Sequence, residues 1–335
     1  MRNHLAPLPT IRIVACALAL PAGALAGEGF EGAWALTIPG GAAGCLEIMK
    51  DGGGHSGRIL WGGGSVLPLA SVSVDGDKLT VTRVREVKKK DASGAMKTEK
   101  VTDTITAKAN GDDLSLVLES PGPKGAIQKS EFSGKRQPPM PKRPDLSKVK
   151  FGEPIQLFNG KDLSGWRLVA DAPNGWRAEN GVLINRPAQE EGKPKKRYGN
   201  LRTDREFEDF RISTEVKVPE HGNSGIYLRG IYEVQVADWF DKPVDSHGMG
   251  AVYSRITPTA NPCKKPGEWQ SLEITLVDRH ATVILNGQKI IDNEPVPGCT
   301  GGALSSDVTR PGPIYLQGDH EAVDFRNMVL RPVVR

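Results

Sequence analysis

Hydrophobic and polar residues alternate along most of this chain, in short runs separated by turn sequences. This alternation predicts half-buried β-strands, because successive side chains of a strand point to opposite faces of its sheet. Asn110-Gly111, Asn180-Gly181 and Asn286-Gly287 are turn sequences typical of tight hairpins. Helical periodicity is nearly absent, and we therefore predict an all-β protein.

The first half of the chain, residues 28–136, carries alternating runs at hairpin spacing. They predict a small antiparallel β-domain, folded as a barrel or a sandwich because closure removes exposed edges. Residues 88–100 are rich in Lys, Asp, Ser and Gly, which indicates a long solvated hairpin tip. We find no group of catalytic residue types in this half, and interpret it as an accessory for binding or packing.

A proline-rich stretch, residues 137–150, predicts an extended linker at a domain boundary. Beyond it, residues 151–335 carry a dense series of strand-like runs. These runs favour a two-sheet jelly-roll sandwich, concanavalin-like in architecture. The expected strands lie at residues 155–158, 176–183, 200–203, 210–218, 251–254, 269–277, 282–285, 314–317 and 323–330.

One stretch, residues 221–238, has an unusual polar face. Its apolar positions fall on one side of two short strands, and the other side presents a phenol, a guanidinium, a carboxylate and a carboxamide. These groups are Tyr227, Arg229, Glu233 and Gln235. Mixed donors and acceptors of this kind suit the hydroxyls of a sugar. The same residues are also compatible with an Arg229–Glu233 ion pair on a solvated sheet.

Composition narrows the choice of partners. The chain has 335 residues, with 39 Gly and 25 Pro, and a net charge of +4 in which acids and bases are mixed. Its length suggests about two domains. No basic stretch is interleaved with aromatic residues, so we do not expect nucleic acid to be a partner.

The N-terminus, residues 1–26, is typical of a signal peptide. Arg2 and Arg12 give it a positive start, and an apolar stretch follows. The stretch ends at Ala24-Leu25-Ala26, which resembles a signal-peptidase cleavage site. Lipidation at Cys16 is an alternative, but most of the apolar region lies after that residue. No later apolar run approaches the ~18 residues needed to span a bilayer. We expect an exported protein, periplasmic or extracellular, without a transmembrane segment.

Three cysteines follow the signal segment: Cys45, Cys263 and Cys299. Export would permit disulfides. Cys263 and Cys299 both lie in loops rich in Pro and Gly, and we predict that they pair. Cys45 would then be buried and inert, or free.

Residues Leu157–Trp166, reading LFNGKDLSGW, resemble the opening signature of the 3-keto-disaccharide hydrolase domain family, whose members are exported jelly rolls similar to concanavalin and laminarinase. Further motifs resemble the family in its order and cover most of the second half, but not the first domain or the linker. They lie at residues 223–229, 232–235, 266–270, 285–287, 316–320 and 325–327. The cysteine pair is outside this pattern.

The resemblance implies cleavage of glycosides whose sugar carries a ketone at C3. The ketone acidifies the C2 proton, a base removes it, the glycosidic oxygen leaves C1, and water adds. Glu233 or His320 would be the base. Arg229, or a divalent cation such as Ca²⁺ held by Glu233 and Asp238, would stabilise the enolate.

Other residues would bind an oligosaccharide or glycoside. Hydroxyl contacts are expected from Asn223, Tyr227, Gln235, Asp238 and Gln317. Trp269 would offer an apolar face, Asp319 would orient His320, and His247 would lie in a loop over the cleft. Asn223 is also compatible with turn chemistry, and Trp269 with a core position.

Three alternatives stay open. A retaining glycosidase could use Glu233 and Asp238 in a Glu-x-Gln-x-x-Asp run, if a bulge brought both carboxyls to one face at ~5–5.5 Å. A noncatalytic carbohydrate-binding protein could use the same concave sheet. A structural role at the cell envelope would leave the polar residues scattered. Convergence of Glu233, Arg229 and His320 in one cleft would favour the enzyme.

Overall fold

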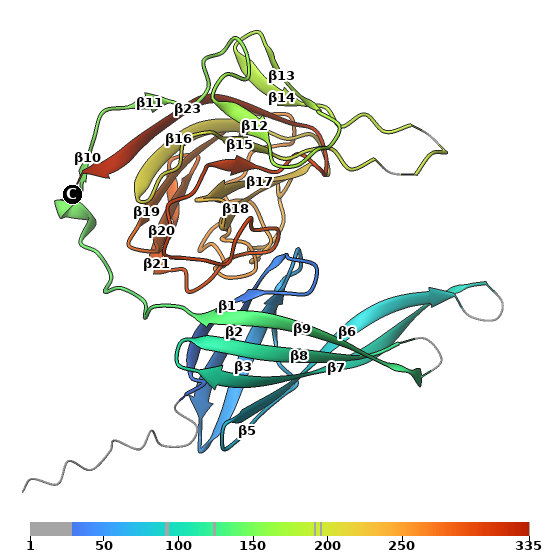
Figure 1. Cartoon of the computed structure of the whole chain (residues 1–335). Coiled ribbons are helices and arrows are strands. Elements are labelled where there is room, and N and C mark those ends of the chain that lie inside the picture. Colours follow the sequence, from blue (N-terminus) through green and yellow to red (C-terminus); the bar gives the residue numbers. More distant parts are fainter. Residues whose placement is uncertain (1–28, 91–93, 123–124, 191, 195, 335) are drawn as a thin grey trace, which may run out of the picture.

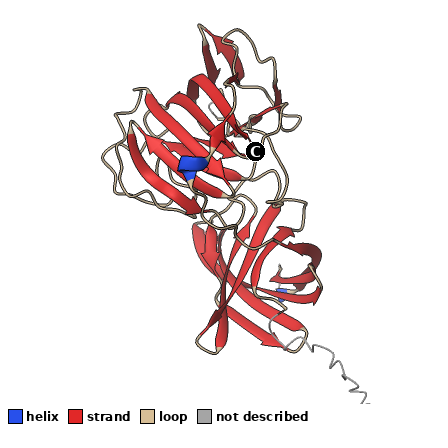
Figure 2. Ribbon diagram, turned by 90° about the vertical axis from the view of Figure 1, so that its left-hand side faces the viewer, coloured by secondary structure: helices blue, strands red, loops and turns tan. Residues whose placement is uncertain are grey.

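The structure, a computed structural model, describes residues 29–90, 94–122, 125–190, 192–194 and 196–334. The predicted signal segment and Cys16 lie outside these residues. The named elements within them are strands and the short 3₁₀ helix η2 (Leu146–Lys148), and most of the chain is strand or loop (Figure 1, Figure 2). No helix among the described residues is both long and apolar enough to cross a membrane. The prediction of an all-β chain is confirmed.

The first domain, residues 32–136, is a single nine-stranded antiparallel sheet in the order β4-β3-β2-β1-β9-β8-β7-β6-β5 (Figure 1). Its strands are β1 (Gly32–Thr37), β2 (Ala43–Asp51), β3 (Gly54–Trp61), β4 (Val66–Pro68), β5 (Ser71–Asp75), β6 (Lys78–Lys90), β7 (Met96–Asn110), β8 (Asp113–Pro121) and β9 (Ile127–Arg136). The two outermost strands, β4 and β5, are consecutive in the chain. Only residues 69 and 70 separate them, so the sheet must curl back on itself, around a core that includes Trp34, Leu46 and Leu79.

The hairpin formed by β6 and β7 is longer than its composition predicts. Residues 88–100 are polar enough to indicate a solvated tip, but the pairing continues to Lys90 and Met96. A ladder can continue through polar residues when cross-strand side chains attract each other. Lys89 and Glu99 do so here, with 3.0 Å between Nζ and Oε2.

The second domain, residues 150–334, contains two antiparallel sheets. The larger has the order β13-β14-β23-β16-β19-β20-β21, with β10 and β11 paired to β23. Its strands are β10 (Lys150–Phe151), β11 (Ile155–Gln156), β13 (Trp176–Glu179), β14 (Val182–Asn185), β16 (Phe210–Lys217), β19 (Gln270–Val277), β20 (His280–Leu285), β21 (Gln288–Pro295) and β23 (Val323–Val334). The smaller has the order β12-β15-β22-β17-β18. Its strands are β12 (Trp166–Leu168), β15 (Leu201–Thr203), β22 (Tyr315–Leu316), β17 (Asn223–Leu228) and β18 (Tyr232–Ala237).

The two sheets of the second domain enclose an apolar core. Ile226 and Val234 from the smaller sheet are fully buried in one cluster with Ile274 and Phe325 from the larger sheet. This packing confirms the predicted jelly-roll sandwich. The expected strand at residues 251–254 is absent from the described chain, because Val252 forms only isolated bridges there.

The domains share a buried interface. Cys45 and Leu60 of the first domain belong to the apolar core of the second. Glu47 lies 2.8 Å from the Nη1 atom of Arg255, and both side chains are almost fully buried. The linker also lies along the second domain, where Asn293 donates a hydrogen bond to the carbonyl of Pro144. Proline-rich composition predicted extended chain, and these contacts hold it in place.

Candidate active site

A cavity of about 390 Å³ lies on the outer face of the smaller sheet. Alternation along β17 and β18 explains its position. Ile226 and Val234 point to the core, whereas the paired positions Tyr227 and Glu233 point outward. The cavity is lined by Gly63, Arg197, Asn200, Asn223, Tyr227, Glu233, Gln235, Tyr253, Gly301, Gly302, Tyr315, Gln317, Asp319 and His320.

Glu233 is the most perturbed acid of this cavity. Its side chain is buried, and burial raises the pKa of its carboxyl from 4.5 to about 8. The negative charge of Asp319 acts in the same direction, while the nearby Tyr227 hydroxyl partly opposes both. Gly225 makes room for this carboxyl, because a Cβ atom at that position would overlap Glu233 Oε1. A carboxyl with such a pKa can accept and release protons near neutral pH.

Two phenols support the floor of the cavity. Tyr227 stacks on Tyr315, with ring centroids 4.3 Å apart. The Tyr227 hydroxyl donates to the carbonyl of Gly301 at 2.7 Å, and Asn200 donates to the Tyr315 hydroxyl at 2.6 Å. Burial, with the charge of Glu233, raises the pKa of Tyr227 well above its ordinary value. The Tyr227 side chain therefore stays neutral, and its hydrogen bond to Gly301 holds its ring next to Glu233.

Three amide oxygens in the cavity are buried and have no hydrogen-bond partner in the described part of the chain. They belong to Asn223, Gln235 and Gln317. Each unsatisfied buried acceptor costs about 1–3 kcal/mol. Donors from a ligand would remove that cost. The observation suits a ligand with several hydroxyl groups.

Asp319 and His320 form a pair at one side of the cavity, with 2.9 Å between Oδ1 and Nδ1. Asn200 holds the backbone here by accepting from the N–H groups of Gly318 and Asp319. Burial acts to raise the pKa of Asp319, but the hydrogen bond and charge of His320 outweigh it and lower that pKa. Asp319 is thus an anion that orients His320.

The structure brings most of the predicted site residues together, but not Arg229. Its guanidinium donates to the carbonyls of Val308, at 2.8 Å, and Arg310, at 3.0 Å from Nε. The predicted alternation fails here because β17 ends at Leu228 and Arg229 begins a turn, with a left-handed φ of 56°. The prediction that Arg229 lies in the cleft was wrong. Among the described residues, no ion pair joins Arg229 to Glu233.

Asp238 and Trp269 also lie outside the cavity lining. Asp238 follows the end of β18 and accepts from the backbone N–H of His221 at 3.0 Å. The guanidinium of Arg326 stacks over the Trp269 ring at 4.0 Å, next to the larger sheet. The pair of carboxyls required for a retaining glycosidase, Glu233 and Asp238, is therefore not in one cleft. The described residues contain no group of three His, Cys, Asp or Glu side chains placed to hold a metal ion.

His247 lies next to the cavity without lining it. Its ring packs edge-on against Tyr253, with centroids 4.8 Å apart. Its Nδ1 atom is 2.9 Å from Asp245 Oδ1, and its Nε2 atom is 2.9 Å from Ser65 Oγ. Its carbonyl accepts a hydrogen bond from Gln235. His247 therefore contacts two cavity residues and, in addition, the first domain.

The predicted Cys263–Cys299 disulfide is wrong. All three described cysteines are free. Cys299 is buried at the domain interface, where its thiol donates to the carbonyl of Gly44, next to Cys45. Burial raises the pKa of the Cys45 thiol to about 11. Loop composition could not reveal that Cys299 packs against another domain.

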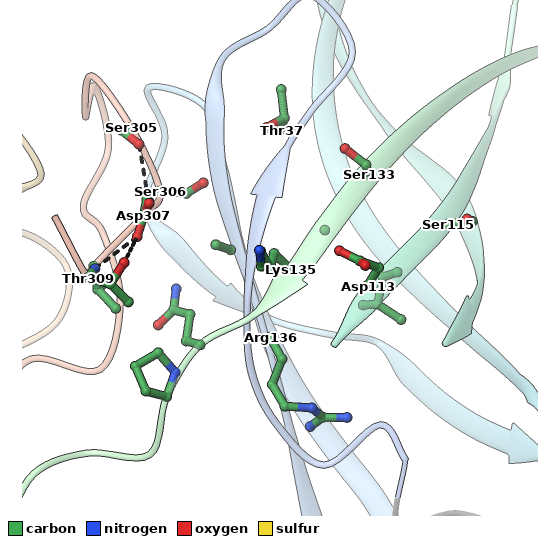
Figure 3. A pocket seen from close by; sticks show the side chains of 16 residues that line it. Thr37, Asp113, Ser115, Ser133, Lys135, Arg136, Ser305, Ser306, Asp307 and Thr309 are labelled. Carbon is green, nitrogen blue, oxygen red and sulfur yellow. Dashed lines mark hydrogen bonds between the residues drawn. The ribbon is translucent and has the colours of Figure 1, made fainter. Parts of the chain in front are cut away.

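A larger cavity, of about 570 Å³, lies between the domains (Figure 3). Figure 3 shows Asp113 and Lys135 of the first domain on one side, and Asp307 and Thr309 on the other. None of the predicted site residues lines it. Its two carboxyl groups, Asp113 and Asp307, are not buried as Glu233 is, so we place the chemistry in the smaller cavity.

Several cavity residues were missed. Asn200 and Tyr315 lie in predicted strands. Tyr315 precedes Leu316, which packs in the core, so alternation places Tyr315 on the opposite face of the strand, toward the cavity. Arg197 and Gly63 lie in loops, where the sequence shows no periodicity. Their positions depend on the tertiary fold alone.

Residues 153–331 match the profile of a family described as the 3-keto-alpha-glucoside-1,2-lyase-like domain. Two solved structures from Parabacteroides distasonis, both provisionally named glycosyl hydrolases, are similar to this chain. One is 31% identical, covers 55% of this chain and 90% of its own, and has a TM-score of 0.43. The other is 25% identical, covers 54% and 100%, and has a TM-score of 0.41. A search of curated proteins gave no match.

Proposed function

The chain belongs to the family of 3-keto-alpha-glucoside-1,2-lyase-like domains, and from this premise we propose that it cleaves 3-keto-glycosides by elimination and hydration. The observation that carries the proposal is the buried Glu233 carboxyl, with its pKa of about 8, in a cavity rich in hydrogen-bonding groups. The C2 proton of a 3-keto sugar needs a base of raised pKa in a water-poor site, and Glu233 meets both needs.

In the proposed reaction, the Glu233 carboxylate removes the proton from C2. The electron pair of that bond forms the enolate of the C3 ketone, and the C1–oxygen bond then breaks with its electrons going to the leaving oxygen. His320, held by Asp319, gives a proton to that oxygen. His320 then takes a proton from the water whose hydroxyl adds to C1, and Glu233 returns its proton to C2, so both residues are restored and the net reaction is hydrolysis.

The remaining cavity groups would bind and orient the sugar. The free amide oxygens of Asn223, Gln235 and Gln317 would accept from its hydroxyls. Arg197, a cationic lining residue, would stabilise the negative charge of the enolate, the role first expected of Arg229. The two carboxyls first expected to hold a divalent cation, Glu233 and Asp238, do not converge, so we assign the role to Arg197 and expect chelator to have no effect.

The first experiment compares a 3-keto-glucoside with the matching unoxidised glucoside, with and without chelator. We expect cleavage of the keto sugar only, and loss of about 10²–10⁴-fold in kcat/KM for Glu233→Gln. The exposed Glu179→Gln is the matched control, because Glu179 lies on β13 in an ion pair with Arg177. Cleavage of both sugars would instead indicate a conventional glycosidase, and binding without cleavage a carbohydrate-binding protein.

A further inference from the structure

One lining residue of the active cavity, Gly63, comes from the first domain. It lies in the loop between β3 and β4, well before residue 153, where the match to the family begins. We infer that this loop closes one side of the cavity and limits the size of the glycoside that can bind. The inference rests on the proposed function and adds to it a specificity element supplied by the first domain, outside the residues that match the family.

The loop is anchored at several points to the second domain. The backbone N–H of Val66 donates to Ser254 Oγ at 2.8 Å. Ser65 Oγ lies 2.9 Å from His247 Nε2. The carbonyl of Gly62 accepts from the N–H of Gly302, itself a lining residue, at 3.3 Å. Contacts on both sides of Gly63 therefore fix its position relative to the cavity.

The same loop supports the segment that holds the proposed base. Gly301 packs against the backbone of this loop, because a Cβ atom on Gly301 would overlap the Gly64 carbonyl oxygen and lie 3.0 Å from that of Gly63. The neighbouring Thr300 accepts from the backbone N–H of Glu233 at 2.9 Å, and Gly301 accepts from Tyr227. The first-domain loop, the 300–302 segment and the β17–β18 hairpin are thus three layers in contact. A wall built in this way resists displacement by a bulky substrate.

The size of the cavity agrees with a small ligand. Its volume of about 390 Å³ is near the lower end of the ~300–1,000 Å³ typical of small-molecule sites. A long polysaccharide bound through an internal residue needs a groove that is open in both directions. A fixed wall at Gly63 leaves space for a terminal sugar and a short leaving group.

The test enlarges the wall by one side chain. A Cβ atom at Gly63 would meet no other atom within 4 Å, and Gly63 is not among the glycines with left-handed backbone, so Gly63→Phe should fold. Gly64→Phe is the matched control. Gly64 also has ordinary backbone, but it borders a separate surface depression, with Trp61 and Arg83.

The substrates are methyl 3-keto-glucoside and a 3-keto-glucosyl-glucose. We expect Gly63→Phe to lower kcat/KM at least tenfold more for the disaccharide than for the methyl glycoside, with Gly64→Phe close to wild type for both. Equal loss on both substrates, or equal behaviour of the two variants, would overturn the inference.

Calorimetric binding of the two unoxidised sugars separates this inference from the proposed function. If wild-type protein cleaves neither keto sugar, the proposed reaction fails. The wall is then judged by affinity alone. Selective loss of disaccharide binding in Gly63→Phe supports it, whereas unchanged relative affinities refute it.

Discussion

Replacing Glu233 by Gln should make the protein more stable at alkaline pH, as well as inactive. Glu233 has a pKa of about 8 in the folded protein, against 4.5 for the ordinary residue. Between these values the folded state holds a proton that the unfolded state has released. Wild-type stability therefore falls as pH rises through this range. The side-chain amide of the Glu233→Gln variant does not titrate, so the variant lacks this contribution.

The expected magnitude follows from the size of the shift. One pKa unit corresponds to ~1.36 kcal/mol, so the interval from 4.5 to about 8 corresponds to roughly 5 kcal/mol. The difference in free energy of unfolding, variant minus wild type, should be constant below pH 4.5. It should grow in favour of the variant up to about pH 8 and then level off.

Denaturant unfolding of both proteins at pH 5, 7 and 9 measures this difference directly, without substrate. Parallel stability curves for wild type and variant would refute the argument that Glu233 is buried with a raised pKa. The pH profile of kcat/KM provides an independent readout. The rising limb of that profile should follow the same pKa, since only the carboxylate accepts the C2 proton.

Three further substitutions test the surroundings. Gly225→Ala should displace the Glu233 carboxyl and lower kcat/KM by about 10²-fold, the typical cost of a misplaced catalytic group. Asp319→Asn removes a charge that raises the pKa of Glu233, so the pH profile of kcat/KM should move to lower pH. Arg255→Ala removes the partner of the buried Glu47 across the interface and leaves it only the partly exposed Arg58, so it should cost up to about 3 kcal/mol in denaturant unfolding.

Two of these variants have a matched control. Gly64→Ala places a methyl group in open surroundings, with its nearest neighbour at 3.6 Å, and should leave kcat/KM unchanged. Lys108→Ala breaks an exposed ion pair with Asp77 and should cost less than about 1 kcal/mol. A profile for Asp319→Asn that moves to higher pH would contradict the assigned electrostatics. Equal costs for Arg255→Ala and Lys108→Ala would contradict the buried interface.

Local patterns predicted the sandwich and the polar strand pair because both depend on alternation along the chain. Tyr227, Glu233 and Gln235 face the cavity for that reason alone. The same rule failed at Arg229, where the strand ends and the backbone turns. A period of two gives the face of a residue only as long as the strand continues.

Alternation and loop composition could not predict contacts between segments that are distant in the sequence. The predicted partner of Cys299 was Cys263, on grounds of loop composition, yet Cys299 packs against the first domain. Arg197 and Gly63 reach the cavity from loops whose paths are set by the whole fold. Asp238 was assigned to the site by its spacing from Glu233, but it lies just past the strand, where it caps a turn.

The continuous core between the domains bears on how this protein can be divided. The match to the family model covers residues 153–331, which suggests that the second domain is a self-contained module. Cutting there would uncover Cys299 and the Arg255 side chain, both buried by the first domain. A protein expressed from the linker onward would thus expose an apolar surface that promotes aggregation, and its Arg255 would lack an ion-pair partner. The smallest unit suitable for expression, engineering or transfer between proteins is therefore the pair of domains.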